Sequence, residues 1–155
     1  MLSPVVSAEA MEAEGTIFVG GGVPFGNGME VFRLDSERDR WTRVANLPVS
    51  RTNYALAAYG DSLYAIGGSV FVIGEGQVPQ PSVFVYSIER DRWVDGIAMP
   101  EGRAHHATTV VGERIVVLGG IREFGRSTKL AVYDLTTGQW SEGAALTRDG
   151  ASLRD

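Results

Sequence analysis

The sequence predicts an all-β fold in which one four-stranded unit is copied three times. Three Gly-Gly pairs close apolar runs and recur after 47 and then 52 residues, while three tryptophans recur after 52 and then 47. The first two tryptophans each precede the next glycine pair by 26 residues. No amphipathic stretch of about 10 to 12 residues appears, so helices are not expected and the repeated unit stacks on its copies. The signature residues are Gly20-Gly21, Gly67-Gly68, Gly119-Gly120, Trp41, Trp93 and Trp140.

The most regular element is the apolar run that precedes each glycine pair. Short apolar runs bounded by turn residues predict strands that are buried on both faces. A glycine pair at the end of such a strand allows positive φ or close backbone approach, so we assign the glycines to packing. The predicted strands are Thr16–Val19, Leu63–Ile66 and Ile115–Leu118.

A second pair of strands follows in each copy and forms a hairpin. In each copy a tryptophan lies seven positions after an equivalent residue, which is Leu34, Tyr86 or Tyr133. The tryptophan therefore lies on the fourth strand, where its large ring is expected to pack between units and its indole N–H to find a carbonyl. The third strands are predicted over Val31–Asp35, Val83–Ser87 and Leu130–Asp134.

The first strand of each unit is rich in small side chains and follows an arginine. Arg51 leads into Ala55–Tyr59, and Arg103 leads into Ala107–Val111. Small residues are expected where inner strands crowd around an axis. The N-terminal counterpart, Ala8–Glu12, carries glutamates that suit a solvent-facing edge better than a buried strand.

Together these residues resemble the Kelch repeat. The shared pattern is Arg-x-x-His/Tyr, a small-residue strand, an apolar strand with Gly-Gly, then Tyr-Asp and Trp, over residues 4 to 150. The resemblance implies a Kelch-type β-propeller, here a partial or half propeller of three four-stranded antiparallel blades. The blades are predicted over about 4–47, 51–99 and 103–146, with 147–155 as the start of a further repeat. The first copy departs from the pattern, because Leu34 replaces the tyrosine and Pro4 the arginine.

Three blades are too few for a closed ring, since propellers typically have about 4 to 8. Two interpretations follow. The first is that the sequence belongs to a longer propeller, which we favour because Arg148-Asp-Gly-Ala151 resembles the beginning of a fourth copy. The second is a homodimer, in which two chains supply six blades around a twofold axis.

Composition excludes several classes of function. The apolar (44%) and charged (21%) fractions are typical of a globular protein, and the net charge of −5 argues against a general nucleic-acid binder. No run of about 18 apolar residues and no signal peptide is present, so we predict no membrane partner and a cytoplasmic location. Without cysteine, and with His105 and His106 adjacent on a strand and pointing to opposite faces, we expect no metal site and no cofactor.

The candidate binding site lies where the inner strands begin and where the loops after the glycine pairs emerge. Arginines at equivalent positions suit bidentate contacts with carboxylates, which predicts an acidic peptide segment or an acidic sugar as the ligand. The structural alternative is that each arginine pairs with a neighbouring blade. The predicted ligand- or partner-binding residues are Arg51, Asn53, Tyr54, Arg103, His105, Arg122, Phe124, Arg126 and Arg148.

The loop after the second glycine pair, residues 69–82, is the longest of the three. It contains the apolar run Val70–Ile73 together with Pro79 and Pro81. We expect this run to pack on a neighbouring loop rather than to form an exposed partner-binding tongue.

We therefore predict a Kelch-repeat module that binds a protein or peptide partner, with no catalytic residues. The alternative is a small-molecule enzyme, since some Kelch propellers are sialic-acid mutarotases that act on an acidic sugar. Its candidate polar groups are Arg51, Arg103, His105 and Glu123. Fold alone does not decide between the two, because propellers carry unrelated activities.

Overall fold

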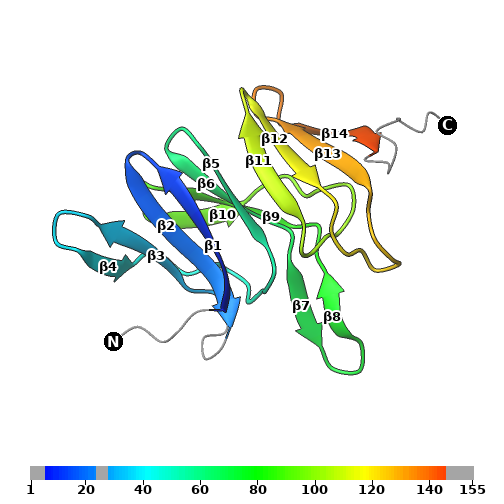
Figure 1. Cartoon of the computed structure of the whole chain (residues 1–155), viewed down its shortest axis with the longest axis horizontal. Helices are drawn as coiled ribbons and strands as arrows, with labels where there is room; N and C mark the ends of the chain where they lie inside the picture. The colour runs from blue at the N-terminus through cyan, green and yellow to red at the C-terminus, as the bar shows by residue number, and fades with distance from the viewer. Residues whose placement is uncertain (1–5, 24–27, 146–155) are drawn as a thin grey trace.

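The computed structural model describes residues 6–23 and 28–145, which form strands, turns and loops without any helix (Figure 1). Three four-stranded antiparallel sheets follow one another along the chain, and a two-stranded hairpin extends from the second sheet. The predicted all-β fold of three four-stranded blades is confirmed. We number the blades 1 to 3 in chain order.

The strand bounds agree closely with the sequence-based expectation. Blade 1 has the order β1 (Val6–Ala13), β2 (Thr16–Val23), β3 (Val31–Asp35), β4 (Arg40–Arg43). Blade 2 has the order β5 (Ala55–Tyr59), β6 (Ser62–Ile66), β9 (Val83–Ser87), β10 (Arg92–Asp95). Blade 3 has the order β11 (Ala107–Val111), β12 (Arg114–Leu118), β13 (Lys129–Asp134), β14 (Gln139–Ala145). The hairpin, β7 (Ser69–Val72) and β8 (Gly76–Pro79), is inserted between β6 and β9.

The first strands of the three blades lie next to one another. Strand β5 contacts β1 on one side and β11 on the other (Figure 1). Ala55 and Ala57 of β5 are buried, because only small side chains fit where the strands converge. Strand β1 takes the inner position in blade 1, and its Glu9 and Glu12 are exposed, as their charge predicts.

Apolar side chains fill the two spaces between neighbouring blades. We call the contact between blades 1 and 2 the first joint and the contact between blades 2 and 3 the second joint. The buried cluster of the first joint comprises Ala13, Phe18, Val31, Leu47, Tyr54, Leu56, Leu63, Ala65, Phe84, Tyr86 and Trp93. The cluster of the second joint is smaller and comprises Ala57, Ile66, Val83, Met99, Ile115, Val117 and Ala131.

A tryptophan ties each later blade to the one before it. The indole N–H of Trp93 donates to the carbonyl of Ala45 over 2.8 Å, and that of Trp140 donates to the carbonyl of Ile97 over 2.8 Å. Both acceptors lie just after the outer strand of the preceding blade. The packing role predicted for these two tryptophans is confirmed.

The tyrosine on the neighbouring strand packs against each tryptophan ring. Ring centroids lie 5.1 Å apart for Tyr86 and Trp93 and 5.0 Å apart for Tyr133 and Trp140, in tilted arrangements that favour aromatic attraction. Trp93 is 7% exposed, whereas Trp41 in blade 1 is 36% exposed.

Two local expectations were wrong. Gly20 and Gly21 do not end their strand, because β2 continues to Val23. The run Val70–Ile73 does not pack on a neighbouring loop: it forms β7 and the start of the hairpin turn, and Phe71 is 71% exposed. Gly74 (φ +90°) and Gly76 (φ +82°) allow a hairpin here that holds these apolar side chains out in solvent.

Candidate ligand-binding face

One face of blades 2 and 3 carries the loops predicted to bind a partner. The β7–β8 hairpin extends from blade 2, and the segment between β12 and β13 lies beside it (Figure 1). In that segment an isolated bridge pairs Ile121 with Arg126, and the Arg122 N–H donates to the Gly125 carbonyl over 2.9 Å. These contacts hold Phe124 at the tip, where it is 82% exposed.

A cleft of about 400 Å³ separates the hairpin from this loop. Prolines from blade 2 form one wall, and the loop of blade 3 forms the other. The cleft therefore crosses the second joint. Its lining residues are Pro79, Pro81, Glu101, Gly102, Arg122, Glu123 and Phe124.

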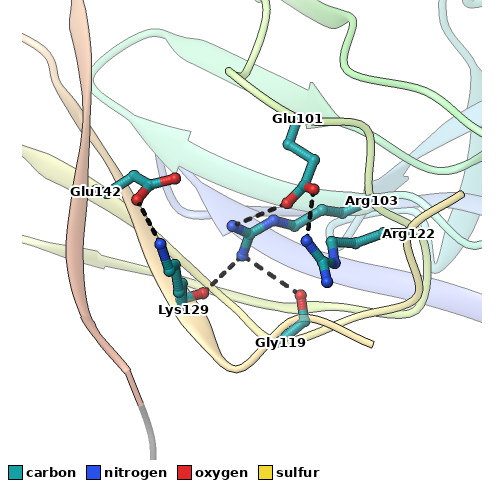
Figure 2. Close-up of polar contacts among 6 residues, drawn as sticks. All are labelled: Glu101, Arg103, Gly119, Arg122, Lys129 and Glu142. Carbon is teal, nitrogen blue, oxygen red and sulfur yellow. Dashed lines mark hydrogen bonds and ion pairs between the residues drawn. The ribbon is translucent and has the colours of Figure 1, made fainter. Parts of the chain in front are cut away.

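An ion pair forms the polar side of the cleft. Nη1 of Arg122 donates to Oε1 of Glu101 over 2.8 Å, and the two side chains are 35% and 41% exposed. Figure 2 shows Glu101 between two guanidiniums, with Arg103 at 3.9 Å on its other side. Arg122 therefore lines the cleft while already paired with a carboxylate of the same chain, that of Glu101.

Arg51 is buried and bound inside its own blade. Its Nη1 donates to the carbonyls of Gly67 (2.8 Å) and Ser82 (3.2 Å), and Nη2 donates to Oγ of Ser82 (2.9 Å). Its guanidinium also stacks over the Phe84 ring at 4.4 Å, a cation–π contact. Removal from solvent lowers the pKa of Arg51 to about 10.

Arg103 repeats this arrangement in blade 3 (Figure 2). Its Nη1 donates to the carbonyl of Lys129 over 2.7 Å and approaches that of Gly119 at 3.5 Å. Burial lowers the pKa of Arg103 as well. Both arginines are 2% exposed, so their guanidiniums are not available to a ligand and the ligand contact that we predicted for them is not retained. Each bridges strands of its own blade, not a neighbouring blade as the structural alternative supposed.

Asn53 and His105, each two positions after one of these arginines, meet just before the inner strands begin. Asn53 and His105 adopt the left-handed conformation (φ +58° and +55°), and the His105 N–H donates to the Asn53 carbonyl over 3.0 Å. Sequence reasoning placed both in the site, and the structure brings their backbones together. His105 is exposed and Asn53 is half-buried.

Tyr54 and His106 occupy equivalent buried positions in the two joints. Tyr54 is 2% exposed, so it packs within the first joint and is not a surface contact as predicted. His106 is 8% exposed, and burial together with the charge of Arg103 lowers its pKa to about 4. The second joint therefore holds an uncharged imidazole where the first holds a phenol.

The remaining predicted residues divide between surface and undescribed positions. Arg126 is exposed and has no ion pair within residues 6–23 and 28–145. Arg148 lies outside the described residues. Sequence reasoning missed Phe71, Ile73 and Glu101 as parts of this face. Two signals were available: the length of the middle loop, and its apolar run ending in Gly74 and Gly76.

No group of three or more His, Cys, Asp or Glu side chains that could hold a metal ion is found among the described residues. Nor does any helix in that part of the chain have the length and apolar character to cross a bilayer.

Comparison with known proteins places this arrangement in a family. A solved structure of YjhT superposes with a TM-score of 0.82 at 21% identity, covering 94% of this chain and 53% of that one. Kelch-like protein 36 of Rattus norvegicus is 25% identical over 115 residues, which are 74% of this chain and 19% of that protein. Beta-scruin of Limulus polyphemus is 29% identical over 119 residues, which are 74% of this chain and 13% of that protein.

The chain thus spans about a fifth or less of these two curated relatives. The family model for the Kelch motif matches residues 50–96 and 102–147, which contain blades 2 and 3. Blade 1 lies outside the match but has the same strand order. The protein belongs to the Kelch-repeat family.

Proposed function

We propose that the protein is a Kelch-repeat binding module that recognises a protein or peptide partner through the loops of blades 2 and 3. This proposal rests on exposed apolar side chains of these loops: Phe124 (82% exposed), which lines the cleft, and Phe71 (71%) and Ile73 (92%) on the hairpin whose Pro79 lines the same cleft. Large apolar side chains exposed on loops of the same two blades indicate an interaction site, and aromatic side chains that become buried carry much of the energy of protein interfaces. Similarity to the Kelch-like relatives supports an interaction role.

The partner chemistry follows from the charges around these anchors. Arg126 is exposed beside Phe124, while Arg122 is shared with Glu101. We propose a segment that places an apolar side chain in the cleft and an acidic residue near Arg126. From the sequence-based set, the proposal keeps Asn53, His105, Arg122, Phe124 and Arg126, and it adds Phe71 and Ile73.

A peptide-display selection on the purified protein tests this function. Selected peptides are then measured by titration calorimetry against wild type, Phe71→Ala and Phe124→Ala. Each substitution should weaken binding about tenfold or more, as expected for loss of an anchor of roughly 1.4 kcal/mol or more. Val111→Ala is the matched control, because Val111 is 62% exposed at the other end of an inner strand. Peptides that bind both loop variants as tightly as wild type would refute the loop face.

The alternative, an enzyme acting on an acidic sugar, stays a prediction. Two of its four candidate groups, Arg51 and Arg103, are buried, while His105 and Glu123 are exposed. An assay of acidic-sugar mutarotation separates the readings: turnover lost in His105→Ala or Glu123→Gln would support the enzyme and displace the binding proposal.

We also propose the blade limits 4–47, 51–99 and 103–146. The described strands support these limits, since β1–β4, β5–β10 and β11–β14 fall within them in turn.

A further inference from the structure

The first joint contains a set of hydrogen bonds, which we call the clip, that holds both backbone polar groups of one residue, Ala45. Asp91 Oδ1 accepts the Ala45 N–H over 2.7 Å, and Trp93 donates to the Ala45 carbonyl over 2.8 Å. The Tyr86 hydroxyl donates to the same Asp91 oxygen over 2.7 Å and orients it. Blade 2 therefore binds the backbone at the end of the outer strand of blade 1.

Position in the repeat identifies the bound residue. Ala45 follows Trp41 by four residues, and Ile97, which Trp140 binds in the second joint, follows Trp93 by four. The residue four after a tryptophan is thus the one that the next blade binds. In blade 3 this residue is Ala144, which is exposed at the end of β14.

Blade 1 presents the aspartate and the tryptophan of the clip, while Leu34 stands where blade 2 has Tyr86. Asp39 stands two residues before Trp41, as Asp91 stands two before Trp93. The backbone is prepared in the same way, since φ is +48° at Asp39 and +45° at Asp91. Trp41 is 36% exposed where Trp93 is 7% exposed, so its indole lies open at the flank of the blade.

We propose that Asp39 and Trp41 of one copy bind the backbone of Ala144 of a second copy. Each copy carries both halves, so two such contacts around a twofold axis close a ring of six blades, within the range of about four to eight that propellers use. The contact repeats the aspartate and tryptophan hydrogen bonds of the first joint, without the tyrosine hydroxyl, and does not involve the loop face.

Engineered cysteines test the contact directly, because the chain has no cysteine of its own. The double variant Asp39→Cys/Ala144→Cys should form a disulfide-linked dimer under mild oxidation. Asp91→Cys/Ala45→Cys is the geometric control and should form the same bridge within one chain. Phe71→Cys/Ala144→Cys should stay unlinked. Absence of the linked dimer in the first variant, with the bridge formed in the control, would overturn the proposal.

Sedimentation of the unmodified chain gives a second test. Wild type should be a dimer with twice the chain mass of 16.7 kDa. Trp41→Ala and Asp39→Ala should each raise the dimer dissociation constant at least tenfold, while Phe71→Ala leaves it unchanged. A monomeric wild type, open-ended polymers, or a dimer indifferent to both changes would overturn the proposal. Peptide binding at the loops is measured separately, so failure here leaves that function standing.

Discussion

The two joints of this protein use the same repeat and differ in the side-chain contacts that hold them. The first joint has the larger apolar cluster and the clip formed by Tyr86, Asp91 and Trp93 around Ala45. In the second joint Gly138 stands where blade 2 has Asp91, so only the Trp140 side of the clip remains. Blades 1 and 2 are therefore expected to act as one rigid unit to which blade 3 is held more weakly.

The cleft of the candidate binding face crosses the second joint, the one expected to be weaker. Pro79 and Pro81 belong to blade 2, and Arg122 and Phe124 belong to blade 3, so a partner in the cleft touches both blades. A ligand that binds only the closed arrangement stabilises it by mass action. Partner binding is thus expected to strengthen the second joint and leave the first almost unchanged.

Removing the tryptophans should give the largest difference between the joints in lost unfolding free energy. Trp93→Ala should lower the free energy of unfolding by about 3–5 kcal/mol, because it opens a cavity in a closed cluster. Trp140→Ala should cost only about 2 kcal/mol, since that ring is half-buried and loses less apolar area. Urea denaturation measures both values. Equal losses would show that the joints are equally packed.

Acid should weaken the second joint selectively through His106. Its folded pKa of about 4 lies below the ordinary value of 6.5, so between these pH values the unfolded chain binds a proton that the folded chain does not. Stability should therefore fall as the pH falls from 6.5 to 4, by up to about 3 kcal/mol.

Replacing His106 tests this slope. The His106→Tyr variant, which has the side chain of Tyr54 from the first joint, should lack the loss between pH 6.5 and 4 in denaturation at a series of pH values. The pKa of Asp134 is lowered to about 2 by hydrogen bonds from Thr136 and Thr137, so its contribution disappears only as the pH falls from 3.8 towards 2. An unchanged slope between pH 6.5 and 4 in the variant would exclude His106 as its origin.

Exchanging the clip residue should convert one joint towards the other. Asp91→Gly gives blade 2 the residue of blade 3 and leaves the Ala45 N–H without its acceptor, at a cost of about 1–3 kcal/mol. Glycine tolerates the positive φ at this position, so the effect reports the lost hydrogen bonds. Thermal and urea unfolding should agree on the loss. A cost near zero would mean that the clip is not a stabilising contact.

The reverse exchange, Gly138→Asp, should have the smallest effect. A Cβ at Gly138 would have only the Tyr133 hydroxyl within 4 Å, at 3.7 Å, so an aspartate fits there. Its carboxylate can then accept a hydrogen bond from that hydroxyl. The new hydrogen bond should contribute roughly 0.5–1 kcal/mol to the free energy of unfolding. The positive φ of the aspartate opposes this gain. Gly112→Asp, at a glycine of φ +57° with open space around it, measures that backbone cost alone. A Gly138→Asp variant no more stable than this control would show that no clip forms.

The sequence was sufficient for the strands and for the tryptophans, because these depend on a pattern repeated in each copy. β3, β5, β9 and β11 have the predicted bounds. The roles of Arg51 and Arg103 were not predictable in the same way. Their burial depends on carbonyls of Gly67, Ser82 and Lys129, which lie 16 to 31 residues away and converge only in the folded blade.

The exposed hairpin shows a different limit. Val70–Ile73 has the composition of a buried strand, and composition predicts burial only when a partner surface is present. The two-stranded sheet gives the run its backbone partner, and Phe71 is left facing solvent. The residues of the loop face each occur in one blade only. The other copies therefore give no equivalent residues from which their exposure could be predicted.

Native-state hydrogen exchange tests the inequality of the two joints most directly. Amides of β11–β14 should exchange through an opening of lower free energy than those of β1–β6, β9 and β10, and the gap should widen from pH 7 to pH 5 as His106 takes effect. The Ala45 amide, held by Asp91, should be protected with the blade 2 strands. A single opening free energy for all three blades at both pH values, or earlier opening of the first joint, would contradict the account.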